Sequence, residues 1–192
     1  MPKAALIGLL LFVGCSGPMI HGRVDEGITV RMFGDAHLER DEDEFEVKCD
    51  GRPGEILILS FLRKGYYPQI RHVKIPEKEL RQEPGPWKKL PDEKNGVLAG
   101  VVCTYGAGGR HVSVFFFEEF LRNHKLPVEL DGELAEIATD ENAVFMLELP
   151  PGDHQLKIAW DPGMFGDKAG TINIQPATTQ ILHICKLTTL VD

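Results

Sequence analysis

The sequence predicts an all-β protein with two small antiparallel β-sandwich domains that follow an N-terminal leader. Three observations support this fold class. Short segments in which apolar and polar residues alternate recur along the chain, which is the pattern of half-buried strands. Glycine, proline and Asp-Gly pairs separate these segments, as turns do. Hardly any stretch has the apolar period of an amphipathic helix, so sheets packed on sheets are expected.

The first predicted domain covers residues 27–76. Its strands are expected at 27–34, 45–49, 55–62 and 69–75, with an acidic segment at 35–44. The segment 55–62, EILILSFL, is apolar on both faces, as a strand in the middle of a covered sheet must be. Cys49 follows Phe45 and Val47 in an alternating strand and is therefore expected to be a small buried core residue.

The second predicted domain covers residues 97–192, after a proline-rich and charged linker at 77–96. A buried strand is expected at 97–105, and the glycine-rich segment 106–110 should turn the chain back into a strand at 111–117. A phosphate-binding loop would need a helix there and a Lys-Ser/Thr pair. Three further hairpins are expected, pairing 125–130 with 133–138 around Asp131-Gly132, 144–149 with 155–160, and 171–174 with 179–187.

Residues 1–14 predict a signal peptide. Lys3 is followed by the apolar run Ala4–Val13, which suits a secretory leader (about 7–15 residues) and is short for a membrane span (about 20). Gly14 and Cys15 then end the run in a way that resembles the bacterial lipobox, although Phe12 stands where that family prefers leucine. The alternatives are an ordinary leader cut near Gly17, or a buried helix.

The lipobox resemblance has consequences for the mature protein. It implies cleavage before Cys15, acylation of Cys15 by chains such as palmitate, and a lipidated cysteine and tether over residues 15–26. Several acyl chains together give a stable anchor where one gives a marginal one. Ser16, rather than Asp, after the cysteine implies the outer membrane, on its periplasmic or surface face.

Two further resemblances concern the domains. Over residues 22–76 the chain resembles the carboxypeptidase regulatory-like domain, a transthyretin-like sandwich, at Phe45, Pro53, Gly54, Gly65, Tyr66 and Tyr67. Over residues 126–187 it resembles PEGA-like and small bacterial lipoprotein domains with an LPPGxH hairpin, at Asp131, Gly132, Leu147, Leu149, Pro150, Pro151, Gly152, His154 and Leu156. Both resemblances imply a fold and no particular activity.

Few residues are candidates for chemistry. Asp35, His37 and Glu39 have the period of one strand face and are weak candidates for a Ca²⁺ or transition-metal site, whereas a solvated acidic loop is the alternative. His154 could act as a general base, but the sequence places no nucleophile beside it, and a structural role after a tight turn is favoured.

Aromatic residues are the remaining candidates for a binding role. Tyr66, Tyr67 and Trp87 could stack on a sugar, although Trp87 is better suited to docking the linker on a domain.

We therefore expect a non-catalytic protein without a cofactor. It would be a membrane-anchored envelope lipoprotein that acts as a binding or structural module for a protein or glycan partner. The net charge of −8 argues against nucleic acid as a partner. The alternatives are a metal-binding accessory protein centred on Asp35, His37 and Glu39, and a secreted soluble ligand-binding protein. Cys49, Cys103 and Cys185 allow one disulfide, and the sequence does not choose the pair.

Overall fold

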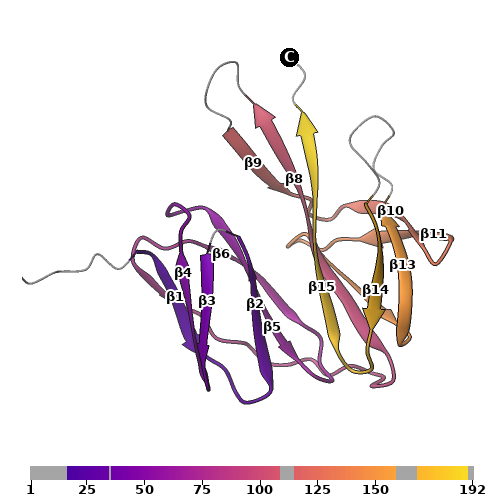
Figure 1. Ribbon diagram of the computed structural model, residues 1–192, viewed down its shortest axis with the longest axis horizontal. Helices are drawn as coiled ribbons and strands as arrows, with labels where there is room; N and C mark the ends of the chain where they lie inside the picture. Colours follow the sequence, from indigo (N-terminus) through magenta and orange to yellow (C-terminus); the bar gives the residue numbers. More distant parts are fainter. Residues whose placement is uncertain (1–16, 35, 109–114, 159–167, 190–192) are drawn as a thin grey trace, which may run out of the picture.

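The computed structural model describes residues 17–34, 36–108, 115–158 and 168–189 and confirms the all-β fold class. Within these residues every regular element is a β-strand, and the strands form four sheets. The sheets stack as two sandwiches that lie side by side (Figure 1). Each sandwich encloses its own cluster of buried apolar side chains.

The N-terminal sandwich packs a four-stranded sheet on a three-stranded sheet. The first sheet has the order β3 (Ala36–Asp41), β4 (Glu44–Cys49), β1 (Met19–Arg23) and β7 (Glu79–Arg81), and the second has the order β2 (Ile28–Phe33), β5 (Ile56–Arg63) and β6 (Gln69–Lys74). Its core forms because alternate residues of each strand turn inward, among them the fully buried Ile20, Val47 and Phe61. Phe45 and Phe61 meet edge to face across the two sheets, with ring centroids 5.7 Å apart.

The C-terminal sandwich also has two sheets. One has the order β11 (Glu133–Ala138), β10 (Lys125–Leu130), β13 (Gly152–Ile158) and β14 (Lys168–Ile174), and the other has the order β12 (Val144–Leu149), β8 (Gly96–Gly108) and β15 (Thr179–Thr189), with β9 (Phe115–Phe120) paired to the far end of β8. Leu98, Phe145 and Ile174 are at most 1 % exposed in its core. The ends of β8 and β15 extend with β9 beyond both sandwiches (Figure 1).

An apolar interface joins the two sandwiches. Odd-numbered residues of β5 fill the N-terminal core, whereas Ile58 turns to the other side and packs with Val101 and Val144. A second cluster adds Val97 and Ala99 of β8 with Leu90. The amide nitrogen of Gly65 donates to the carbonyl oxygen of Ala177 at 2.7 Å across the same boundary. This interface explains why β5 and β8 are apolar on both faces.

Three segments expected to be irregular contain strands. Residues 19–23 lie in the predicted tether, yet they form β1, which runs between β4 and β7 in the interior of a sheet. This position is possible because Ile20 is fully buried in the core and Gly22, which has no side chain, lets the backbone of Gln82 after β7 approach closely. The predicted linker contains β7, which pairs in parallel with β1, and a bridge between Tyr66 and Lys89. The predicted acidic segment contains β3, which pairs with β4 around a turn at Glu42 and Asp43.

The hairpin predictions were partly right. β10 and β11 pair around Asp131-Gly132, whose φ angles of 53° and 85° are those of a type I′ turn. β8 and β9 also pair antiparallel, although their connection lies outside the described residues. The other two hairpins are wrong, because β12 pairs with β8 while β13 and β14 pair with each other, and β15 runs parallel to β8. The turns after β12 and β14 therefore carry the chain from one sheet to the other.

Candidate binding surface

The outward face of the sheet β3-β4-β1-β7 carries a set of charged side chains, which we call the outer charged face. It consists of His21, Arg23, Glu39, Asp41, Glu44, Glu46 and Arg81. Strand alternation forms it, because Ile20 and Val47 turn fully into the core and their neighbours must therefore turn outward. The strand register places Glu39 opposite Glu46, Glu46 opposite His21, and His21 opposite Arg81, so that one row crosses all four strands.

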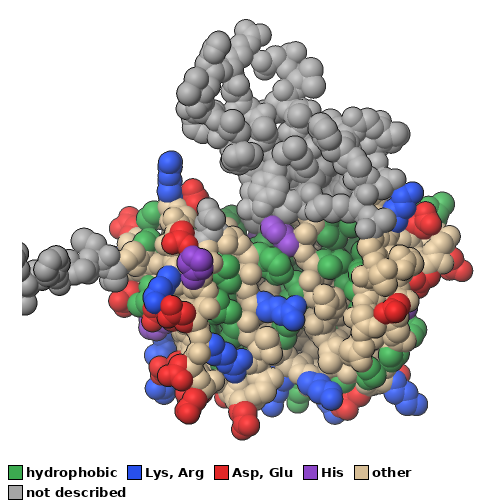
Figure 2. Space-filling view, viewed as in Figure 1, with side chains coloured by type: hydrophobic (Ala, Val, Ile, Leu, Met, Phe, Trp, Pro, Cys, Tyr) green, Lys and Arg blue, Asp and Glu red, His purple; other side chains and the backbone are tan. Residues whose placement is uncertain are grey.

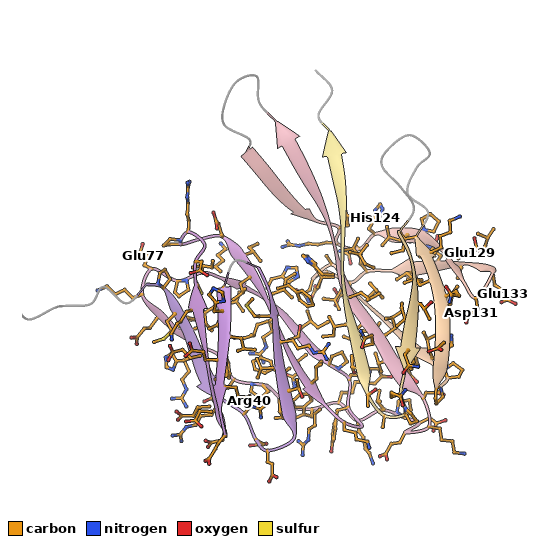
Figure 3. All side chains as sticks on the ribbon, in the orientation of Figure 1. Arg40, Glu77, His124, Glu129, Asp131 and Glu133 are labelled. Carbon is orange, nitrogen blue, oxygen red and sulfur yellow. The ribbon has the colours of Figure 1, made fainter. Side chains whose placement is uncertain are left out.

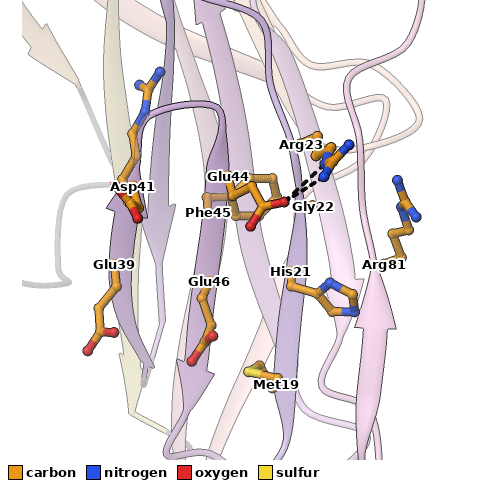
Figure 4. Close-up of a pocket in the computed structure, with 11 residues that line it drawn as sticks. Met19, His21, Gly22, Arg23, Glu39, Asp41, Glu44, Phe45, Glu46 and Arg81 are labelled. Atoms are coloured by element: carbon orange, nitrogen blue, oxygen red, sulfur yellow. Dashed lines mark hydrogen bonds and ion pairs between the residues drawn. The ribbon is translucent and has the colours of Figure 1, made fainter.

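Charge is divided across this face. The carboxylates lie on β3 and β4, whereas His21, Arg23 and Arg81 lie on β1 and β7 (Figure 4). Together with Met19, Gly22, Arg40 and Phe45 these side chains line a groove of about 760 Å³. Arg23 Nη2 and Glu44 Oε1 are 3.0 Å apart where the two halves meet. Figure 2 shows acidic and basic side chains gathered over this end of the molecule.

Lys48 relieves part of the repulsion on the acidic half. Its Nζ lies 2.8 Å from Glu39 Oε1 and 3.7 Å from Glu46 Oε1, between two carboxylates that stand directly opposite each other. The hydrogen bond with Glu39 is the main reason that the pKa of Lys48 is raised. All these ion pairs are exposed to solvent, so they contribute little to stability and their members can exchange partners at low cost.

A second groove, of about 530 Å³, lies where the chain leaves β1 and β7. Arg23, Asp25, Asp43, Glu83 and Trp87 are among the residues that line it. Trp87 also packs against the N-terminal core and meets Tyr66 edge to face, with ring centroids 6.0 Å apart.

The other two aromatic candidates for sugar binding are engaged by the protein. The Arg63 guanidinium stacks 4.8 Å from the centroid of the Tyr66 ring. The Tyr67 hydroxyl donates a hydrogen bond to Glu148 Oε1 across the boundary between the sandwiches. This hydrogen bond is the main reason that the pKa of Tyr67 is raised.

His154 joins two turns of the C-terminal sandwich. Its Nδ1 lies 2.7 Å from Asp131 Oδ2, at the β10–β11 turn, and its Nε2 lies 2.9 Å from the carbonyl oxygen of Pro150, after β12. Figure 3 labels Asp131 at the end of this hairpin, near Glu129 and Glu133. The amide nitrogen of Gln155 also donates to Asp131 Oδ1 at 2.8 Å.

This geometry suits a protonated imidazole. A carbonyl oxygen only accepts hydrogen bonds, and an ionised carboxylate does the same, so both ring nitrogens of His154 donate. The hydrogen bond to Asp131 raises the pKa of His154, with help from the Pro150 carbonyl. The hydrogen bond from His154 lowers the pKa of Asp131, with help from the Gln155 amide. Both ring nitrogens are engaged, which favours the structural role over that of a general base.

The two metal candidates that the structure describes, His37 and Glu39, are each paired with a different side chain. Asp35 lies outside the described residues. His37 Nε2 is 3.3 Å from Asp50 Oδ2, and Glu39 is paired with Lys48. In the part of the chain that the structure describes, no group of three or more His, Cys, Asp or Glu side chains is placed to hold a metal ion.

Of the cysteines, Cys15 lies outside the described residues, and Cys49 is buried in the N-terminal core, as predicted. Burial is the main cause that raises the pKa of the Cys49 thiol. No helix in the described ranges has the length and apolar character needed to cross a membrane.

Comparisons with known proteins give a limited result. No family model matches the chain, and no curated protein does. Solved structures match the chain at a low level, among them two bacterial proteins. The minor pilin GBS52 of Streptococcus agalactiae has a TM-score of 0.35 and 13% identity, over 79% of this chain and 71% of that one. The TIE protein of Bacillus anthracis has a TM-score of 0.33 and 15% identity, over 91% of this chain and 34% of that one.

The outer charged face was not predicted because three of the four strands of its sheet, β1, β3 and β7, lie in segments that were expected to be irregular. A signal was present in residues 19–23, where Met19, His21 and Arg23 alternate with Ile20 and Gly22. Five residues with a glycine among them are a weak strand pattern, and the acidic run of β3 is typical of a loop.

Proposed function

We propose that this protein is a membrane-anchored envelope lipoprotein, lipidated at Cys15, whose two joined sandwiches act as a non-catalytic binding module. The observation that carries the binding role is the groove on the outer charged face. It is lined by exposed side chains of both signs that contribute little to stability. Complementary charge across an interface favours specificity and rapid association.

The division of charge favours a protein partner over a neutral glycan. Carboxylates on β3 and β4 fit basic side chains, while Arg23 and Arg81 on the other half fit acidic ones. Only a partner that carries both basic and acidic groups can pair with both halves of the outer charged face. The apolar interface between the sandwiches supports the same role, since it presents this face on a fixed body.

Site-specific photocrosslinking tests the binding role. A photoreactive amino acid at His21, in the middle of the groove, should capture a partner in intact cells, whereas the same group at Leu134, 87% exposed on β11, should not. The matched variant exchanges the charges of one pair, Arg23→Glu with Glu44→Arg. It keeps the ion pair and reverses the local field, so capture from position 21 should fall at least tenfold.

The outcomes separate the partners. Equal capture from positions 21 and 134, or capture that is unaffected by the charge exchange, would contradict the binding role of this face. A captured product that resists protease and contains sugar would identify a glycan in place of a protein.

The anchor has its own test. Intact mass of the protein from a membrane fraction should show a chain that begins at Cys15 with added acyl mass, and Cys15→Ala should lose that species. A soluble chain cut beyond Cys15 would end the lipoprotein proposal.

A further inference from the structure

Two of the cysteines lie opposite each other on neighbouring strands. The parallel register of β8 and β15 runs without a break from Val97 and Thr179 to Ala107 and Thr189, and Cys103 is the partner of Cys185 within it. Both cysteines lie inside the paired region and several residues from either end of it. Their opposition is therefore a property of the register.

The strand period also gives them equivalent positions on the two strands. In β8, Ala99 and Val101 face the N-terminal sandwich, and their partners in β15 are Ile181 and His183. Cys103 and Cys185 follow two residues later on each strand, which is one full period of strand alternation. Neighbouring strands lie about 4.7–4.9 Å apart. This spacing lies within the range of about 4.4–6.8 Å over which the Cα atoms of two cysteines can be bridged.

The third cysteine of the described chain is far from this pair. Cys49 is 7% exposed in the N-terminal core, on β4. The sheet β2-β5-β6 lies between that strand and β8, because β5 packs on β4 with one face and on β8 with the other. Cys49 therefore cannot reach either of the other two without unfolding the sandwich.

We infer that Cys103 and Cys185 form a disulfide that ties β8 to β15. Each thiol gives up one proton and one electron, and one S–S bond forms. The two electrons and two protons reduce a disulfide-bearing oxidant, such as glutathione disulfide or an oxidised dithiol protein, to two thiols. The inference rests on the proposed export only for the source of that oxidant in cells, since the pairing itself follows from the register.

Peptide mapping of the full chain tests the pairing. The purified, reduced protein is incubated with glutathione disulfide, quenched in acid, blocked with a maleimide and digested with trypsin. We expect residues 95–110, which contain Cys103, to be joined to residues 169–186, which contain Cys185, and Cys49 to carry the maleimide. Cys49→Ser should leave the link intact. Cys103→Ser should free Cys185 for labelling without a new link.

Each result decides the inference. Maleimide on both Cys103 and Cys185 after oxidation, or a link that includes Cys49, would overturn it. A link that forms with glutathione disulfide but is absent from protein isolated from cells would support the pairing and count against export.

Discussion

Gly22 offers a sharp test of the N-terminal sandwich. It lies on β1, which has β4 on one side and β7 with the following residues on the other. A Cβ atom added at this position would lie 1.7 Å from the carbonyl oxygen of Gln82 and 2.8 Å from the Phe45 ring. Because real Cβ contacts essentially never fall below 3.0 Å, the Gln82 carbonyl would have to retreat by at least 1.3 Å.

That retreat has a calculable cost. The Gln82 amide donates to the carbonyl oxygen of His21 at 2.8 Å, and this bond would be lost or strained. Losing a backbone hydrogen bond costs about 1 kcal/mol, and crowding a packed site costs about 1–3 kcal/mol. We expect Gly22→Ala to lower the free energy of unfolding by about 3 kcal/mol, out of the total of about 5–15 kcal/mol that is usual for a domain.

Urea unfolding measures this loss. With a slope of about 2 kcal/mol per molar, the midpoint should fall by about 1.5 M. The control is Gly170→Ala on β14, where an added Cβ meets no atom within 4 Å. Its midpoint should stay within about 0.3 M of the parent, since exposed substitutions usually change stability by less than about 0.5 kcal/mol. A Gly22→Ala protein as stable as the control would refute the close approach of β1 and the segment after β7.

Three other results are expected. The Asp131–His154 pair should stabilise the folded protein fully between pH 3.8 and 6.5, the ordinary pKa values of the two groups. This stabilisation should be lost as pH falls through the lowered pKa of Asp131 or rises through the raised pKa of His154. Urea midpoints measured across this pH range should vary less with pH in Asp131→Asn than in the parent protein. Ile58→Ala should cost about 3 kcal/mol by opening the interface, whereas Met146→Ala, 41% exposed, should cost little by the same assay. Trp87→Ala should speed tryptic cleavage after Lys88, and unchanged cleavage would contradict its docking role.

The strands that were predicted correctly from the sequence are those whose residue pattern has a single physical explanation, such as a turn-forming pair or two apolar faces. β10 and β11 were placed correctly because Asp131-Gly132 can adopt the two positive φ angles that a tight hairpin needs. β5 and β8 were predicted to be covered on both sides because their sequences are mainly apolar on both faces, whereas a strand with one solvent-exposed face has polar residues at alternate positions. The outer face of β5 is covered by the C-terminal sandwich, and the outer face of β8 is covered by the N-terminal sandwich.

Pairing was harder to predict than strand position. Alternation shows which residues face a core but not which sheet contributes them. Phe145, Leu149, Leu156 and Ile158 do share one core, yet they face each other from opposite sheets instead of neighbouring strands. The same limit produced the wrong hairpin between β14 and β15, since the turn between them crosses between sheets.

The early start of β1 limits how far the folded part could stand from a membrane. If Cys15 carries the lipid, only Ser16, Gly17 and Pro18 separate it from β1. An extended chain advances at most about 3.5 Å per residue, so Met19 would lie within about 14 Å of the anchored cysteine. The N-terminal sandwich would then rest at the level of the lipid headgroups, and a partner would have to come to the bilayer surface to meet it.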